Sequence, residues 1–115
     1  IVAIEPPEAA PELAVNANYQ WYLAMMLDDT LSPASPFVDG WVKRIEPTEA
    51  LANSLSEGEG LSDVAALGAN GVWYDTVAQL AELQQGQASD EIAGHWYELL
   101  ESVSLAEVAT APLVL

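Results

Sequence analysis

A single histidine, His95, is the residue best suited to acid–base chemistry in this chain of 115 residues. A serine hydrolase would use it as the base for a hydroxyl nucleophile, for which the candidates are Ser32, Ser54, Ser62 and Ser104. None of these serines lies in the Gly-x-Ser-x-Gly pattern of a nucleophile elbow. We therefore interpret His95 as a partly exposed helix residue, solvated or hydrogen-bonded to a backbone carbonyl, and we expect no catalytic residue and no enzyme activity.

Pairs of carboxylates could also carry chemistry, because they can serve acid–base catalysis or ligate calcium. The pairs are Asp28 with Asp29, Glu57 with Glu59, and Glu98 with Glu101. Eighteen acidic residues make such neighbours expected by chance, and no Asp-x-Asp-x-Asp-Gly loop is present. The chain has no cysteine, which excludes a thiolate zinc site. We expect a solvated acidic surface with no metal and no cofactor.

Tryptophan and tyrosine side chains could stack on a sugar, because they present flat apolar faces with polar tips. The alternation of apolar residues places Trp21 and Trp41 on strand faces, and helical spacing places Trp73 and Trp96 on helix stripes. We therefore expect the four rings to share one core where the sheet meets the helices.

The only cations, Lys43 and Arg44, stand against eighteen acidic residues and leave a net charge of -16. This charge repels phosphate backbones and anionic lipid, so we expect no nucleic-acid partner. The longest apolar run, Trp21–Leu27, is too short to cross a bilayer, so we expect no membrane insertion. Lys43 and Arg44 are neighbours in a predicted strand, and we expect at least one to pair with a carboxylate of the helical part or of another molecule.

The elements that must position these residues begin with strands, which show apolar alternation at every second residue. The predicted strands are Ile1–Ile4, Tyr19–Leu27 and Phe37–Ile45, with a Pro, Ser and Asp-rich loop over 28–36. Both faces of the second strand are fairly apolar, which favours an interior position. Gly40 indicates a bulge or a close approach to the backbone.

After Pro47 the apolar spacing changes to about 3.6 residues, which is typical of helices. The predicted helices cover 48–55, 61–69, 72–85 and 90–103, with a short final helix over 104–110 and an acidic linker over 56–60. Gly71 should end the second helix in a left-handed conformation, and Ser89 or Asp90 should cap the fourth. Ser104 and Glu107 fit a capping box.

These elements predict one α+β domain over residues 1–115. Its β part, 1–46, should contribute antiparallel strands to a sandwich-like sheet, and its helical part, 47–115, should form a bundle or helical hairpin.

Several sequence motifs follow one another in a fixed order. They are Tyr19–Tyr22 (YQWY), Gly40–Ile45 (GWVKRI), Gly71–Asp75 (GVWYD), Leu80–Leu83 (LAEL) and Trp96–Val103 (WYELLESV). This series resembles the cyanobacterial domain of unknown function numbered 928 over nearly the whole chain. The resemblance implies a β part followed by a helical cap, an extracellular or envelope location, and a further β-rich region before Ile1, so that this chain is the C-terminal portion. It implies no enzyme activity, cofactor or catalytic residue.

Three strands cannot close a sandwich or protect both edges of a sheet. We therefore expect a protein, either the upstream region or a neighbouring subunit of a homo-oligomer, to complete the sheet by strand addition. The residues predicted to bind this partner are Ile1, Val2, Ile4, Trp41, Lys43 and Arg44. The expected function is an assembly or adhesion domain of a cyanobacterial envelope or extracellular protein, with a filament subunit as one form. A carbohydrate- or cation-binding module is the alternative.

Overall fold

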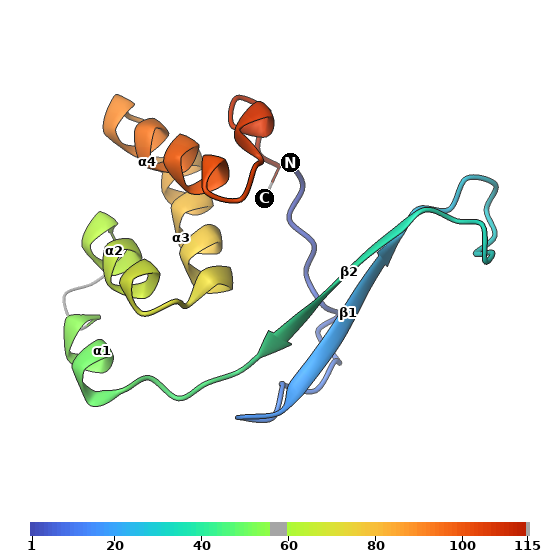
Figure 1. The fold of residues 1–115 in the computed structure, drawn as a ribbon, viewed down its shortest axis with the longest axis horizontal. Coiled ribbons are helices and arrows are strands. Elements are labelled where there is room, and N and C mark those ends of the chain that lie inside the picture. The colour runs from blue at the N-terminus through green and yellow to red at the C-terminus, as the bar shows by residue number, and fades with distance from the viewer. Residues whose placement is uncertain (56–59, 115) are drawn as a thin grey trace. The chain divides into compact units, whose positions relative to one another are not determined.

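Two antiparallel strands precede four α-helices in the described residues, 1–55 and 60–114, of the computed structural model (Figure 1). This order confirms the α+β class. The chain divides into two compact units, Ile1–Pro6 with Pro47–Leu115 and Pro7–Glu46. The main division falls between Glu46 and Pro47, where the sequence pattern changes from strand to helix.

The unit Pro7–Glu46 is built on a hairpin of β1 (Asn18–Ala24) and β2 (Phe37–Lys43). Trp21 lies opposite Gly40, and the register is continuous from one end of the strands to the other. Because residues opposite one another share a face, Trp21 and Leu23 lie on the same side of the sheet as Val38. The two predicted strands and their faces are confirmed, and β1 ends three residues earlier than predicted.

The predicted strand at Ile1–Ile4 is wrong. This segment makes one isolated parallel bridge, between Val2 and Val114, in which the Ala3 N–H donates to the Val114 carbonyl over 2.9 Å. The N-terminal segment therefore belongs to the helical unit. β-branched residues favour extended backbone but do not choose its partner, and here the partner is the end of the same chain. Since the described sheet has two strands, the interior position expected for β1 is also wrong.

The helical unit contains α1 (Glu49–Ser54), α2 (Leu61–Ala69), α3 (Trp73–Gly86), α4 (Asp90–Glu101) and the 3₁₀ turn η1 (Ala106–Val108). All four predicted α-helices are confirmed. The Ser89 hydroxyl accepts from the Ile92 N–H, so Ser89 is the N-cap of α4. The predicted acidic linker lies, except for Gly60, outside the described residues. None of the helices in the described part of the chain is long and apolar enough to cross a membrane.

The ends of α2 and α4 close in the same way. Gly71 has φ 72° and its N–H donates to the Gly68 carbonyl, which confirms the predicted left-handed cap. Ser104 has φ 64° and its N–H donates to the Glu101 carbonyl, so it ends α4 rather than beginning a new helix. The predicted capping box is therefore wrong, because an N-cap residue needs an extended backbone that Ser104 does not have.

The core of the helical unit is a cluster contributed by α2, α3 and α4. Its buried members are Val64, Leu80, Ala81, Ile92, Trp96 and Leu100. The core shared by four tryptophans is wrong, since Trp96 is 2% exposed but Trp41 is 61% exposed. The physical reason is that Trp96 lies on the buried stripe of α4, whereas Trp41 lies on a two-stranded sheet whose own unit has no second layer to cover it.

Candidate functional site

His95 lies beside a shallow groove of about 350 Å³ between α2, α3 and α4. Its Nδ1 is 3.6 Å from Glu98 Oε2 on the next turn of α4, and its side chain is half exposed. The serine in this groove is Ser102, whose hydroxyl donates to the Leu99 carbonyl over 2.6 Å. None of the four serines considered as nucleophiles lines the groove. The interpretation of His95 as a partly exposed helix residue is confirmed, with a carboxylate rather than a carbonyl as its neighbour.

The acidic pairs are not gathered into a metal site in the part of the chain that the structure describes. No group of three or more His, Cys, Asp or Glu side chains there could hold a metal ion. Asp28 Oδ1 accepts a hydrogen bond from the Thr30 hydroxyl over 2.8 Å, within the loop between the strands. The pair Glu57 and Glu59 lies outside the described residues.

The six residues predicted to bind a partner fall into both units. Ile1, Val2 and Ile4 lie in the helical unit and are exposed, and the backbone of this segment pairs with the C-terminal segment. Trp41 and Lys43 lie on β2, and Arg44 follows it. Trp41 and Lys43 share one face of the hairpin, because they are two residues apart.

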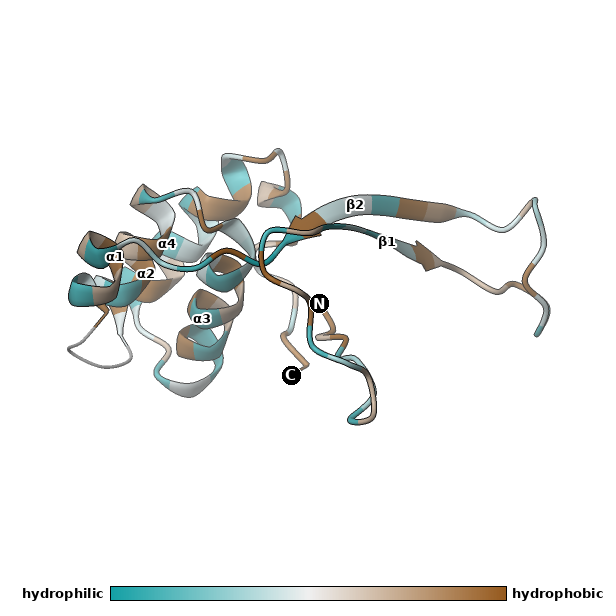
Figure 2. Cartoon of the chain, turned by 90° about the horizontal axis from the view of Figure 1, so that it is seen from below, coloured by the Kyte–Doolittle hydropathy of each residue, from teal (hydrophilic) through white to brown (hydrophobic). Residues whose placement is uncertain are grey.

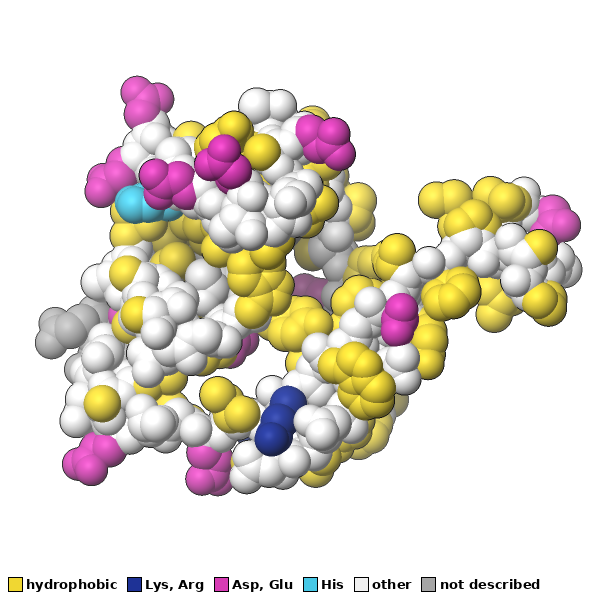
Figure 3. All heavy atoms as spheres, in the orientation of Figure 1, with side chains coloured by type: hydrophobic (Ala, Val, Ile, Leu, Met, Phe, Trp, Pro, Cys, Tyr) yellow, Lys and Arg dark blue, Asp and Glu magenta, His cyan; other side chains and the backbone are white. Residues whose placement is uncertain are grey.

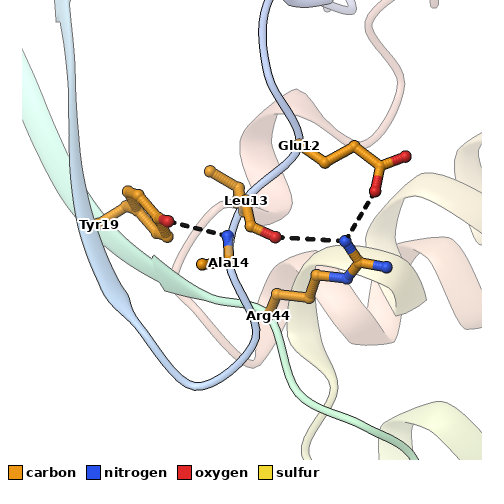
Figure 4. Close-up of polar contacts among 5 residues, drawn as sticks. All are labelled: Glu12, Leu13, Ala14, Tyr19 and Arg44. Atoms are coloured by element: carbon orange, nitrogen blue, oxygen red, sulfur yellow. Dashed lines mark hydrogen bonds and ion pairs between the residues drawn. The ribbon is translucent and has the colours of Figure 1, made fainter.

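Arg44, which directly follows β2, links the end of that strand to the segment that precedes β1 (Figure 4). Its Nη1 donates to Glu12 Oε2 over 3.1 Å and to the Leu13 carbonyl over 3.2 Å, and the Ala14 N–H donates to the Tyr19 hydroxyl over 2.8 Å. Arg44 therefore pairs with a carboxylate of its own unit, and the expectation that at least one of the two cations pairs with the helical part or another molecule stays a prediction. A turn at Ala14–Ala17, in which Asn16 has φ 64°, brings Glu12 and Leu13 back to the strands.

One face of the hairpin carries no charged or amide side chain, and we call it the apolar face. Its residues are Tyr19, Trp21, Leu23, Val38, Gly40 and Val42. A Cβ at Gly40 would lie 2.6 Å from Trp21 Cζ2, so the indole packs directly on the bare backbone of Gly40. This confirms the close approach predicted there. Leu23 and Val38 remain 48% and 58% exposed, and Figure 2 shows hydrophobic residues on both strands at the loop end of the hairpin.

The opposite face, which we call the mixed face, combines polar and aromatic side chains. Gln20 Nε2 donates to Asp39 Oδ2 over 2.9 Å, and the rings of Tyr22 and Phe37 form a tilted pair with centroids 6.3 Å apart. Tyr22, Phe37 and Trp41 are each more than 60% exposed. The sequence pattern assigned Trp41 to a shared core, so it missed this exposed surface.

The loop end of the hairpin is also apolar and open. An apolar hollow of about 360 Å³ is lined by Leu23, Ala24, Met25, Pro36, Phe37 and Val38. Met25, Met26 and Leu27 are each at least 60% exposed. The signal for this surface was present in the sequence as a run that is apolar on both faces, but the same run is typical of a strand inside a sheet.

The hairpin has two open edges, because no third strand pairs with β1 or β2 in residues 1–55 and 60–114. The Met25 N–H donates to the Pro36 carbonyl, and hydrogen bonding alternates along an antiparallel pair. The backbone groups of Leu23 and Val38 therefore point toward the other strand. Those of Phe37, Asp39 and Lys43 point outward along the edge of β2.

The two strands are electrically neutral. Asp39 and Lys43 are their only charged residues and cancel, so the whole net charge of -16 lies outside the strands. In the view of Figure 3, acidic side chains gather mainly over the helices, while hydrophobic side chains cover much of the hairpin. The hairpin is thus the part of this acidic chain where another protein surface meets the least electrostatic repulsion.

Comparison with known proteins returns one family. A family model described as Domain of Unknown Function (DUF928) matches residues 1–113. Neither the comparison with curated proteins nor the comparison with solved structures gives a match.

Proposed function

The chain belongs to the family Domain of Unknown Function (DUF928), and from its exposed hairpin we propose that it is a non-enzymatic assembly or adhesion domain whose sheet is completed by a strand from a neighbouring subunit. The motif resemblance supports two further parts of the proposal. One is a cyanobacterial envelope or extracellular protein, with a filament as one form of the assembly. The other is that the matched segment corresponds to the C-terminal portion of the family's domain.

The observation that carries the proposal is a two-stranded sheet with open edges and an apolar face. An isolated hairpin is marginally stable in water, and sheets of three or more strands or packing on another layer are needed for independent stability. Leu23 and Val38 are about half exposed. Burying one such side chain completely contributes about 1.5–3 kcal/mol, so partial burial of these side chains against those of an added strand would stabilise the hairpin.

Strand addition suits this surface because it uses both of its features. The outward N–H and C=O groups of an edge form main-chain hydrogen bonds to an added strand, and side chains on alternate residues provide selectivity. Natural proteins usually protect such an edge with charges, prolines or covering loops. Neither strand contains a proline, and their only charges, Asp39 and Lys43 on β2, are opposite in sign, so an added strand can match them rather than be repelled.

The environment of His95 supports a non-enzymatic role. Its Nδ1 is 3.6 Å from the solvent-exposed Glu98, and the hydroxyls of Ser102 and Thr76, which line the same groove, both donate to backbone carbonyls. A nucleophile, its base and a third orienting group would have to lie within hydrogen-bond distance of one another.

The acidity of the chain supports an extracellular or saline setting. A net charge of -16 on 115 residues destabilises a compact chain by self-repulsion and opposes its association. Salt screens these charges over roughly 8 Å at physiological ionic strength, and over less in brine.

Light scattering of the chain, from low-micromolar to near-millimolar concentration, tests the proposal. We expect the mass to rise from 12.3 kDa to a multiple of it, and the rise to be lost in Val38→Lys, which charges the apolar face. Val103→Lys, at an exposed apolar residue of the helical unit, is the matched control and should associate normally. A mass of 12.3 kDa throughout, or equal loss in both variants, would contradict the proposal.

A carbohydrate-binding module is the second candidate, favoured by the exposed aromatic rings of Tyr22, Phe37 and Trp41 on the mixed face. Calorimetric titration with a panel of polysaccharides tests it, with Trp41→Ala as the variant that should lose binding. Heat-free titrations with every polysaccharide would remove this candidate.

A further inference from the structure

We propose that the strand that completes the sheet comes from a second copy of this chain, and that the two copies pair antiparallel along their β2 edges with Asp39 opposite Lys43 of the second copy. This inference rests on the proposed function and adds the identity of the partner, the edge and the register. The pairing is symmetric about Trp41, so it forms the same contact twice.

The backbone geometry of β2 permits this register. The groups that point outward belong to the odd-numbered residues of the strand, including Phe37, Asp39 and Lys43. In a pairing centred on Trp41, odd residues oppose odd residues of the second copy. The opposing residues Asp39 and Lys43 can then exchange the two hydrogen bonds that antiparallel strands form.

The charges of β2 select this register among those that the backbone permits. Asp39 and Lys43 are separated by four residues, so an antiparallel pairing centred midway places each opposite the other. A register centred on Gly40 would instead place Lys43 opposite Phe37. Opposite charges that face each other across strands stabilise the pair, and like charges destabilise it.

Lys43 is available for such a contact. It is exposed, and it has no ion pair with any residue of 1–55 or 60–114. The other cation, Arg44, is occupied at the base of the hairpin. Asp39 accepts a bond from Gln20 through Oδ2, which leaves Oδ1 for the second copy.

A second copy fits this edge better than a basic partner. A basic partner would be drawn to the part of the chain that carries the -16 charge, whereas the two strands are neutral. The neutral edge of one copy meets the neutral edge of another without repulsion between the strands themselves. β1 has no charge that could select a register.

The same register also aligns the apolar faces. Even-numbered residues oppose even-numbered residues, so Val38, Gly40 and Val42 of the two copies lie on one side. The result is a four-stranded sheet in the order β1, β2, β2, β1, with the apolar faces of both copies on one side. Four strands exceed the three that a stable sheet requires.

Variants that swap the charges at positions 39 and 43 test the inference, with light scattering as the measure of association. Asp39→Lys and Lys43→Asp each place like charges opposite one another at two symmetric positions, so we expect the dimer dissociation constant to rise about tenfold or more. The double variant restores opposite charges and should dimerise like the original chain. An equimolar mixture of the two single variants should form heterodimers, because each supplies the charge that the other needs.

Asp39→Lys distinguishes a specific pair from general repulsion. General repulsion predicts tighter association, because the variant brings the net charge closer to zero, whereas the specific pair predicts weaker association. Glu8→Lys, which makes the same charge change outside the strands, is the matched control and should associate at least as tightly as the original chain. Asp39→Asn keeps an acceptor for Gln20 and so separates loss of charge from loss of that hydrogen bond.

The outcomes separate this inference from the function on which it rests. Weakening in both single variants with recovery in the double variant supports the β2 pairing. Association that is unchanged in the single variants, or that is not recovered in the double variant, overturns the β2 register while sheet completion stands. A chain that is monomeric at all concentrations overturns both.

Discussion

The contact between Trp21 and Gly40 predicts that Gly40→Ala destabilises the hairpin. The new methyl group would lie 2.6 Å from Cζ2 and 2.7 Å from Cε2 of the indole. Carbon atoms approach to about 3.5–4.0 Å, so the ring must retreat by about 1 Å. Because Trp21 covers the apolar face near the middle of the hairpin, the retreat disturbs the packing of that face.

The magnitude follows from two opposing effects. Overpacking of this kind costs about 1–3 kcal/mol, and replacing Gly by Ala recovers about 0.4–1 kcal/mol by restricting the unfolded chain. The net loss is about 1–2 kcal/mol. Native-state hydrogen exchange of the amides between β1 and β2 measures the opening free energy of the hairpin itself, and these amides should exchange about tenfold faster.

The matched control is Gly94→Ala in α4. A Cβ at Gly94 has no neighbour within 4 Å, so the same substitution should stabilise that helix by about 0.5–1 kcal/mol. Trp21→Leu removes the ring. In that variant, adding Gly40→Ala should cost much less stability than it costs in the original chain. Unchanged or slower exchange between β1 and β2 in Gly40→Ala would refute the packing of Trp21 on Gly40.

Three further predictions concern the core, a helix cap and the charge of the chain. Trp96→Ala should cost about 3–5 kcal/mol of helical-unit stability in urea unfolding, because Trp96 is 2% exposed. Its Nε1 is buried with no hydrogen-bond partner in the described part of the chain, so Trp96→Phe should cost less, and equal losses would contradict this reasoning. Ser89→Ala should cost about 1 kcal/mol of stability because it removes the N-cap hydroxyl of α4, which accepts from the Ile92 N–H. Ser89→Asp should preserve this hydrogen bond and the stability in the same assay. Added sodium chloride should tighten self-association by screening two chains of net charge -16, and weaker association in salt would show that attraction between charges dominates.

Local patterns predicted most of the secondary structure. The spacing of Leu61 to Ala69 with Gly71 after it fixed the bounds of α2, and the alternation from Tyr19 fixed which side chains share a face of the hairpin. These features depend on neighbours in sequence, such as the helical repeat and the left-handed conformation that glycine readily adopts.

The sequence pattern did not predict backbone pairing between segments that are far apart in the chain. Ile1–Ile4 has the composition of a strand, but its bridge is to Val114 at the other end of the chain. Ser104 has a capping-box pattern, yet the closure of α4 requires its backbone in the left-handed conformation. A pattern of residues states what the backbone can do locally, and the tertiary partners decide between the options.

The candidate site was predictable in part for the same reason. Lys43 could be placed on the strand that became β2 from the alternation alone. The pairing of Arg44 with Glu12 depends on the turn at Asn16, for which no pattern was recognised. The exposed ring of Trp41 was assigned to a core because apolar composition indicates burial without saying whether the covering layer belongs to the same unit.

Hydrogen exchange of the outward-facing edge amides, followed against protein concentration, measures the completion of the sheet most directly. We predict that Phe37, Asp39 and Lys43 on β2 gain protection as concentration rises, while Gln20 and Tyr22 on β1 do not. Outward amides that exchange at unprotected rates on both strands, at concentrations approaching millimolar, would contradict an added strand at either edge.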